Sequence, residues 1–400
     1  MSLRICLIND DLYPSRWTNT QQTVKTAAGL AHDAEVELVL PRMWDVFFTS
    51  HERRLAQLSD FYGVSPKFGL TQLAGWPASK LRIPEKLVHG ILAPIYAAYA
   101  DHDVIYSRNV LPMLVGLAMG KPVVWESHRV LKKHYKGSYA AIKALMRHPN
   151  FLGVVTNAAM IADSFVEMGF ESERVLIAHN CYDPADMEPE LTKAEARTKL
   201  GLPASDKIVC YAGHIQRRKG IDTIVAIAAK TPELHYVICG GDPTDVATAQ
   251  QLAREAGAQN MTFTGWIDVA DLSPYLYAAD VLLIPPTAAP LQQHGNTVMP
   301  IKTYTYLAAG RVIVGPKQED VREVLKHGIN CLLVEPDQLD AAVATIRDAF
   351  ADPARMERIG AAAKADAPLY TWEARSRQII GWIEGRLAAR GAAAEARSHA

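Results

Sequence analysis

Short, continuous apolar runs alternate with longer helical segments along almost the whole of this 400-residue chain. A run without polar interruptions is typical of a strand buried on both faces, because an exposed face would carry polar residues at every second position. Strands that alternate with helices form parallel sheets with right-handed crossovers, so the pattern predicts a doubly wound α/β fold. The strands predicted in this way are Arg4–Ile8, Glu35–Leu40, Val104–Ser107, Pro122–Glu126, Gly153–Thr156, Arg174–Ala178, Lys207–Ala212, His235–Gly240, Met261–Thr264, Val281–Pro285, Arg311–Val314 and Cys331–Val334.

The alternation stops at residues 183–205, which are charged, rich in proline and without a buried run, and then it restarts. A chain of this length exceeds one ordinary core, so two domains are predicted. The predicted organisation is a Rossmann-like domain over 1–185, a linker over 186–206, a second Rossmann-like domain over 207–370, a long helix over 371–390 and a disordered tail over 391–400.

Composition excludes several classes of protein. The formal net charge of −1 disfavours a nucleic-acid partner. Five scattered cysteines without a CxxC pair disfavour a disulfide framework and a zinc site, so no metal site is expected. No apolar run approaches the ~20 residues that span a membrane, and Asp10 interrupts the first run too early for a signal peptide. These features lead us to expect a cytoplasmic protein.

Ligands of open α/β sheets bind at the carboxyl ends of strands, so the residues just after each strand are the candidates. Residues 213–220, G-H-I-Q-R-R-K-G, place His214, Arg217, Arg218 and Lys219 together as an anion site, with a solvated basic loop as the alternative. Three further positions lie at the next strand ends. Gly241 allows close ligand approach or a tight turn, and Gly265 with Trp266 offers a surface for a nucleobase or a contact between domains.

Two candidates lie in the first half. His128 follows a buried strand in W-E-S-H, where an imidazole can donate a hydrogen bond or shuttle a proton, or can be structural. Residues 128–148 contain six Lys or Arg and no acid, and Ile142, Leu145 and Met146 give this segment an apolar side. Such a helix can lie on anionic lipid headgroups, with a solvated helix face as the alternative. Attachment at the inner face of the membrane is therefore a second expectation for location.

The stretch from His294 to Pro316 predicts a polar loop, a helix that opens near Pro300, a stop at Gly310 and a strand. Amides at such a helix start can hold a phosphate, while the alternative is a plain surface loop and amphipathic helix. The chain has no GxxxxGK[ST], HExxH or GxSxG motif, so P-loop hydrolysis, zinc hydrolysis and acyl transfer lack their residues.

Five segments of the second half occur in this order: Y-A-G-H-I-Q-R-R-K-G-I-D, F-T-G-W-I, Y-A-A-D-V-L-L-I-P, M-P-I-K-T-Y-T-Y-L-A-A-G-R-V-I-V and H-G-I-N-C-L-L-V-E-P-D. Together they resemble one known family, the retaining GT-B glycosyltransferases of family 4, also called glycosyltransferase group 1. This large family includes bacterial transferases for lipopolysaccharide, capsule and phosphoinositol mannosides. The first half agrees more loosely, through E-V-E-L-V-L-P, K-P-V-V-W-E-S-H and V-L-I-A-H-N-C-Y-D, and the resemblance covers residues 1–385.

The resemblance implies two Rossmann-like domains that face a cleft, with a last helix that crosses back to the first domain. It implies a donor, a UDP- or GDP-sugar, on the second domain and a glycan or lipid-linked acceptor on the first. Lys219 with Arg217 or Arg218 would clamp the diphosphate in place of a metal, and His128 would contact the donor sugar. The other donor-binding positions that it implies are His214, Gly265, Trp266, Asn296, Thr297, Pro300, Ile301, Lys302 and Thr305.

Three positions depart from the family pattern. Family members usually carry two glutamates eight positions apart, and these fall here on Thr297 and Thr305. A hydroxyl is a weaker, neutral hydrogen-bonding group, so ribose binding, donor choice or activity itself can differ. His214 also stands where the family often has arginine, and Arg217 or Arg218 would supply that guanidinium. Three functions follow: a retaining transferase, a degenerate GT-B binding or scaffold subunit, and a GT-B sugar-nucleotide epimerase.

Overall fold

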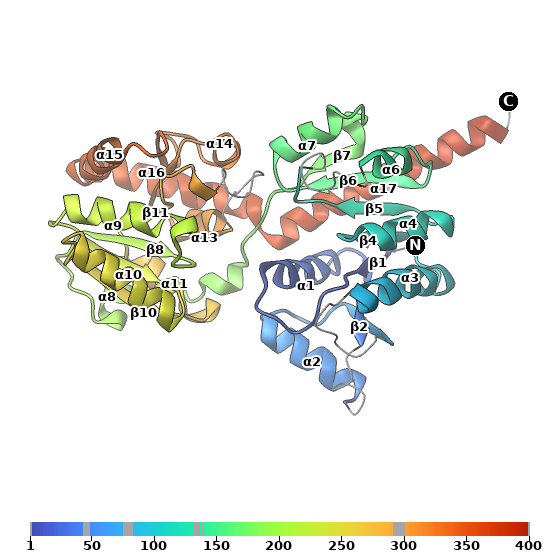
Figure 1. The fold of residues 1–400 in the computed structure, drawn as a ribbon, viewed down its shortest axis with the longest axis horizontal. Helices are drawn as coiled ribbons and strands as arrows, with labels where there is room; N and C mark the ends of the chain where they lie inside the picture. The colour runs from blue at the N-terminus through green and yellow to red at the C-terminus, as the bar shows by residue number, and fades with distance from the viewer. Residues whose placement is uncertain are drawn as a thin grey trace. The chain divides into compact units, whose positions relative to one another are not determined.

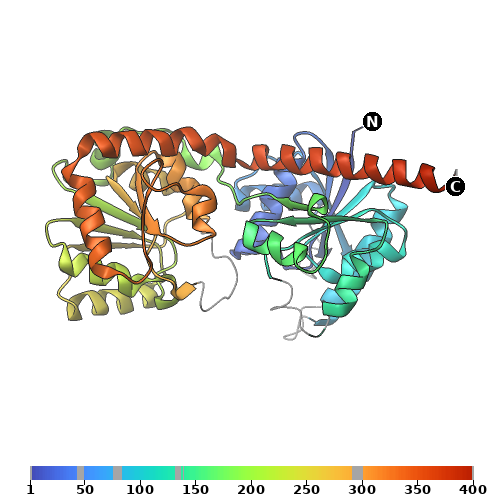
Figure 2. The same cartoon turned by 90° about the horizontal axis from the view of Figure 1, so that it is seen from above.

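The protein consists of two compact α/β units. The computed structural model describes residues 2–42, 49–74, 83–130, 137, 139–290 and 301–398. The first unit combines Met1–His179 with Trp372–Ala400, and the second is Asn180–Thr371. Each unit has one parallel sheet with helices packed on both of its faces (Figures 1 and 2). The doubly wound α/β prediction is therefore confirmed for both halves.

The sheet of the first unit has the strand order β3-β2-β1-β4-β5-β6-β7. Strands β4, β5 and β6 are buried throughout, as their unbroken apolar runs predict. Strand β3 was not predicted, because G-L-T-Q-L-A is partly polar; it pairs only with β2, at the edge of the sheet. The strands are β1 (Arg4–Ile8), β2 (Glu35–Arg42), β3 (Gly69–Ala74), β4 (Val104–Ser107), β5 (Val123–Glu126), β6 (Phe151–Thr156) and β7 (Val175–Ile177).

The helices of the first unit include the last helix of the chain, α17. Its Ile379, Ile380 and Ile383 join the buried core formed by β1, β2 and α1. The helices are α1 (Thr18–Leu30), α2 (His51–Tyr62), α3 (Ile83–Tyr99), α4 (Val110–Ala118), α6 (Tyr139–Leu145), α7 (Ala159–Val166) and α17 (Trp372–Ser398).

Helix α17 packs closely on α1 and extends further than predicted. A Cβ on Gly29 would lie 2.9 Å from the carbonyl oxygen of Trp372, so only glycine permits this approach of the two helices. The helix continues to Ser398, through residues predicted as a disordered tail. That stretch is rich in alanine, the strongest helix former, so it extends the helix.

The sheet of the second unit has the strand order β10-β9-β8-β11-β12-β13, and its six strands are those predicted. The strands are β8 (Ile208–Ala212), β9 (His235–Cys239), β10 (Met261–Gly265), β11 (Val281–Leu283), β12 (Val312–Pro316) and β13 (Leu332–Val334). The helices are α8 (Lys193–Leu200), α9 (Ile221–Lys230), α10 (Pro243–Glu255), α11 (Ser273–Ala278), α13 (Lys302–Ala309), α14 (Val321–Val324), α15 (Leu339–Ala351) and α16 (Pro353–Asp366).

The stretch predicted as a linker, 186–206, folds as part of the second unit. Helix α8 starts with a capping box in which Thr192 and Glu195 exchange hydrogen bonds. Arg197 is buried, donates to the carbonyl of Ala278 over 3.0 Å and pairs with Asp280 over 2.8 Å. One charge of this stretch, that of Arg197, is thus neutralised by Asp280 inside the unit.

Candidate functional site

The candidate site of the second unit lies where the order of successive strands in the sheet reverses. Strand β8 pairs with β9 on one side and with β11 on the other. Strands β8, β9 and β10 follow one another outward, and the chain then returns to β11 on the opposite side of β8. This is the topological switch point at which open α/β sheets bind ligands, and the basic loop 213–220 begins there.

Helix α13 is fastened to this point by Tyr306. Its hydroxyl accepts a hydrogen bond of 2.8 Å from the backbone N–H of Ala212, the last residue of β8. Lys302 lies four residues earlier, on the same face of the helix. Its ammonium lies 3.6 Å from the centre of the Tyr211 ring. A Cβ on Gly213, whose φ is +145°, would lie 2.6 Å from Lys302 Nζ. Helix spacing and one glycine therefore bring Lys302 to the end of β8.

The Tyr306 contact can be tested by a single change. We expect Tyr306→Phe to lower the free energy of unfolding by about 1–3 kcal/mol, because the buried N–H of Ala212 then lacks a partner. Urea denaturation measures this loss, and Tyr99→Phe is the matched control because Tyr99 is exposed. An unchanged urea midpoint in Tyr306→Phe would show that the bond does not fasten the helix.

Lys219 and Lys302 form a pair of cations at this end of the sheet. Burial lowers the pKa of Lys302 well below its usual value, and the nearby charge of Lys219 lowers it further. The pKa of Lys219 is also lowered, first by burial and then by Arg218. Within residues 2–42, 49–74, 83–130, 139–290 and 301–398, neither lysine forms an ion pair with a carboxylate. The two positive charges are available to an anion.

The other basic residues of the loop surround this pair. His214 is exposed, and its pKa is lowered by partial burial and by Lys219, Lys302 and Arg218. Arg218 donates from Nε to Gln216 over 2.6 Å. Arg217 and Arg218 both line a hollow of about 820 Å³ against α10. Lys302 thus contacts the Tyr211 ring at the end of β8, and the role of Arg217 or Arg218 in holding a diphosphate stays a prediction.

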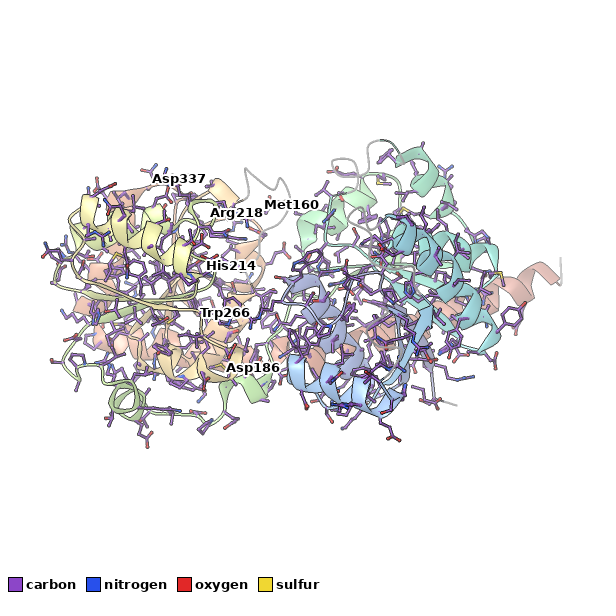
Figure 3. All side chains as sticks on the ribbon, turned by 60° about the horizontal axis from the view of Figure 1, so that its bottom comes forward. Met160, Asp186, His214, Arg218, Trp266 and Asp337 are labelled. Atoms are coloured by element: carbon purple, nitrogen blue, oxygen red, sulfur yellow. The ribbon has the colours of Figure 1, made fainter. Side chains whose placement is uncertain are left out.

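The glycine positions at the ends of β8, β9 and β10 lie in contact. Gly240 donates its N–H to the carbonyl of Gly265 over 2.8 Å, and a Cβ on Gly240 would lie 2.2 Å from the carbonyl oxygen of Gly213. Gly241 follows directly. Trp266 is half exposed beside them, with its indole N–H 3.1 Å from Asp268. Figure 3 shows His214, Arg218 and Trp266 along one edge of the second unit.

Helix α13 carries two more of the predicted positions. Ile301 directly precedes its first residue, and Thr305 is partly buried within it. Asn296, Thr297 and Pro300 lie outside the described residues. Across the described part of the chain, no group of three or more His, Cys, Asp or Glu has the arrangement of a metal site.

His128 lies in the first unit, beside a carboxylate that sequence analysis did not single out. Its Nε2 is 2.8 Å from Oε1 of Glu126, two residues earlier, and Arg108 reaches the same oxygen over 2.8 Å. Burial, followed by the charge of Arg108, lowers the pKa of His128 to about 4, so the ring is neutral near pH 7. The only sequence signal for Glu126 was an acid at the end of an apolar run, V-V-W-E.

The apolar side of the basic segment 128–148 faces the protein core. Ile142 and Met146 are buried, and Leu145 packs against the same cluster. Residues 131–136 and 138 of this segment lie outside the described residues. Among the described helices, none is both long enough and apolar enough to cross a bilayer. The prediction that the apolar side of this segment faces lipid is therefore wrong for Ile142, Leu145 and Met146. Lys143 and Arg147 remain at the surface.

The comparison with protein families concerns the unit that carries the two lysines. Residues 192–366 match the family model described as "Glycosyl transferases group 1". The matched residues lie within the second unit and make up less than half of the chain. The switch point, the basic loop and Lys302 all lie within them.

Curated relatives match about half of the chain. The D-inositol 3-phosphate glycosyltransferase of Mycolicibacterium gilvum is 29% identical over 205 residues, which cover 50% of this chain and 44% of that protein. The lipopolysaccharide core biosynthesis glycosyltransferase LpsE of Rhizobium meliloti is 26% identical over 237 residues, 57% of this chain and 64% of that protein. The chain thus spans between 44% and 64% of these two relatives.

Solved structures match both units of the chain, whereas the family model matches residues 192–366 alone. Anabaena HepE in complex with UDP has a TM-score of 0.73 at 16% identity, covering 96% of this chain and all of that one. Sucrose-phosphate synthase from Thermosynechococcus elongatus has a TM-score of 0.70 at 20% identity, with 97% of this chain covered. Both units therefore share the GT-B fold, which confirms the predicted fold class.

Proposed function

We propose that the chain is a retaining glycosyltransferase that moves a sugar from a nucleotide-diphosphate sugar to a cell-envelope glycan or lipid-linked acceptor. The observation that carries the proposal is the pair of ammonium groups, Lys219 and Lys302, at the carboxyl end of β8. A diphosphate supplies the anionic oxygens that such a pair lacks. The UDP in the HepE structure and the acceptors named for the curated relatives support the same assignment.

In this proposal the lysines act on the leaving group. The bond between the anomeric carbon and the diphosphate oxygen breaks, and its electron pair stays on that oxygen. The acceptor hydroxyl attacks from the same face, and its proton passes to the departing diphosphate. Lys219 and Lys302 stabilise the negative charge that develops there, the kind of electrostatic term that contributes most in preorganised sites. Trp266 and Gly265 border the base, and Thr305 replaces a carboxylate near the ribose.

The decisive experiment separates three outcomes. UDP- and GDP-sugars are screened by thermal shift, since a ligand that binds only the folded state raises the melting temperature. Products are then analysed with and without an acceptor. Glycosylated acceptor with retained anomeric configuration supports the transferase. Conversion of the donor in the absence of an acceptor identifies an epimerase, and no nucleotide binding at millimolar concentration identifies a scaffold.

We also propose that the basic segment 128–148 brings the protein to an anionic membrane surface through charge alone. Binding to phosphatidylglycerol vesicles is expected to fall steeply between 50 and 500 mM salt, because exposed charges are screened. Charge reversal of Lys143 and Arg147, both to Glu, should weaken it, whereas Lys199→Glu in α8 is the control. Vesicle binding that ignores salt, or no binding at low salt, contradicts this proposal.

A further inference from the structure

Glu126 is the centre of a buried network at the carboxyl end of β5. Its side chain is 2% exposed. Oε1 accepts from Nη2 of Arg108, Nε2 of His128 and Nη2 of Arg375, each over 2.8 Å. Oε2 accepts from the hydroxyl of Tyr106 over 2.8 Å. A carboxylate has about four acceptor sites, so these four donors use its capacity.

Arg375 brings the last helix of the chain into this network. It lies in the first turn of α17 and is buried, with 4% of its surface exposed. Its Nε donates to the carbonyl of Ala178 over 3.4 Å, next to the position where the chain leaves the first unit at His179. The first unit is built from two parts of the chain, Met1–His179 and Trp372–Ala400. Arg375 connects the second part to the first, because it bonds both Ala178 and Glu126, the carboxylate beside His128.

We propose that Arg375 is a positioning residue that, through Glu126, fixes the ring orientation and the tautomer of His128. Its catalytic consequence rests on the proposed function and on the contact between His128 and the donor sugar that the family resemblance implies. A neutral ring that donates from Nε2 to Glu126 carries its lone pair on Nδ1. Nη2 of Arg108 lies 3.4 Å from Nδ1 and 3.1 Å from Nε2, so this guanidinium faces the ring beside the carboxylate.

The charges around His128 favour this single tautomer. The facing groups are Glu126 on β5, Arg108 and Tyr106 at the end of β4, and Arg375 on α17. Two guanidinium groups outweigh one carboxylate, so a second proton on the ring is opposed. Burial is the largest cause of the lowered pKa of His128, the charge of Arg108 is the next, and that of Arg375 adds to them.

The test measures the ring itself. Nitrogen-15 NMR of histidine-labelled wild-type protein should show His128 as the neutral Nε2–H tautomer down to about pH 5. In Arg375→Met we expect the pKa of His128 to rise, because one facing cation is lost, and its ring signals to move. The KM for the donor sugar should rise at least threefold while the affinity for free UDP or GDP stays the same. Arg377→Met is the matched control, since Arg377 pairs only at the surface with Glu373.

Unchanged His128 signals in a folded Arg375→Met variant would overturn the inference. Should that variant fail to fold, Arg375→Lys keeps the charge but cannot form the same set of bonds. The His128 signals of Arg375→Lys should then differ from those of the wild type, because the ring is reoriented. Signals identical to those of the wild type would overturn the inference. The NMR result does not depend on turnover. A wild-type protein that binds no donor overturns the proposed function and leaves the NMR result standing.

Discussion

Lys219→Ala is expected to reduce sugar transfer by about 10²–10³-fold, a loss of ~3–4 kcal/mol of transition-state stabilisation. The reason is that, in the proposed function, Lys219 faces the developing charge of the leaving diphosphate at the switch point of the sheet. The measurement is kcat for nucleotide release and for glycosylated product, with a thermal scan to show that the fold survives. The effect should be larger in kcat than in the affinity for donor, since the charge grows along the reaction.

Lys230→Ala is the matched control for this change. Lys230 lies at the far end of the helix that follows the basic loop and forms an exposed pair with Asp340. The variant Lys230→Ala should leave turnover within twofold of the wild type. Near-wild-type turnover in Lys219→Ala would refute the transferase assignment.

Lys302→Met is expected to weaken UDP or GDP binding by about tenfold or more and to remove a proton linkage. Burial and Lys219 lower the pKa of Lys302 in the free protein, and a bound diphosphate raises it again. Nucleotide binding therefore takes up protons at pH values between the free-state and the bound-state pKa of Lys302. Affinity is full below the free-state pKa of Lys302 and falls as the pH rises above it. Calorimetry in two buffers of different ionisation enthalpy measures this uptake in wild type and variant.

Lys207→Met is the matched control for Lys302. Both ammonium groups lie over an aromatic ring, but Lys207 precedes β8 at the opposite edge of the sheet, with its Nζ 5.7 Å from the centre of the Phe350 ring. Its loss should change neither affinity nor proton uptake. Proton uptake that persists unchanged in Lys302→Met would show that another group responds to the diphosphate.

The fold was predictable because burial leaves a direct mark in the sequence. Strands covered on both faces, such as V-L-L in β11, must be apolar throughout, and the glycine and basic residues that follow β8 stand out against them. The edge strand β3 escaped prediction because its one-sided pairing tolerates polar residues. The stretch around α8 was predicted as a linker because its charged residues suggest a surface segment. Its Arg197 is nevertheless buried, because it pairs with Asp280, which lies far from it in the sequence.

The site was predictable only where its residues are adjacent in the chain. The loop 213–220 presents its cations in one run, so the anion site was expected. Lys302 reaches the same point from more than eighty residues away, through the anchoring of α13 by Tyr306. The family resemblance had named Lys302 as a donor-binding position, but no local pattern placed it beside Lys219. Arg375 and Glu126 are separated by 249 positions, and nothing local marks Arg375 as a partner of this carboxylate.

The packing of α17 in the first unit has a consequence for the order of events during synthesis. Residues 1–179 leave the ribosome first, but their core is complete only when Ile379, Ile380 and Ile383 have followed. The second unit, by contrast, is continuous in sequence and has all of its residues by Thr371. Translation usually lets the amino-terminal domain fold first; in this protein the amino-terminal unit is the last to be finished.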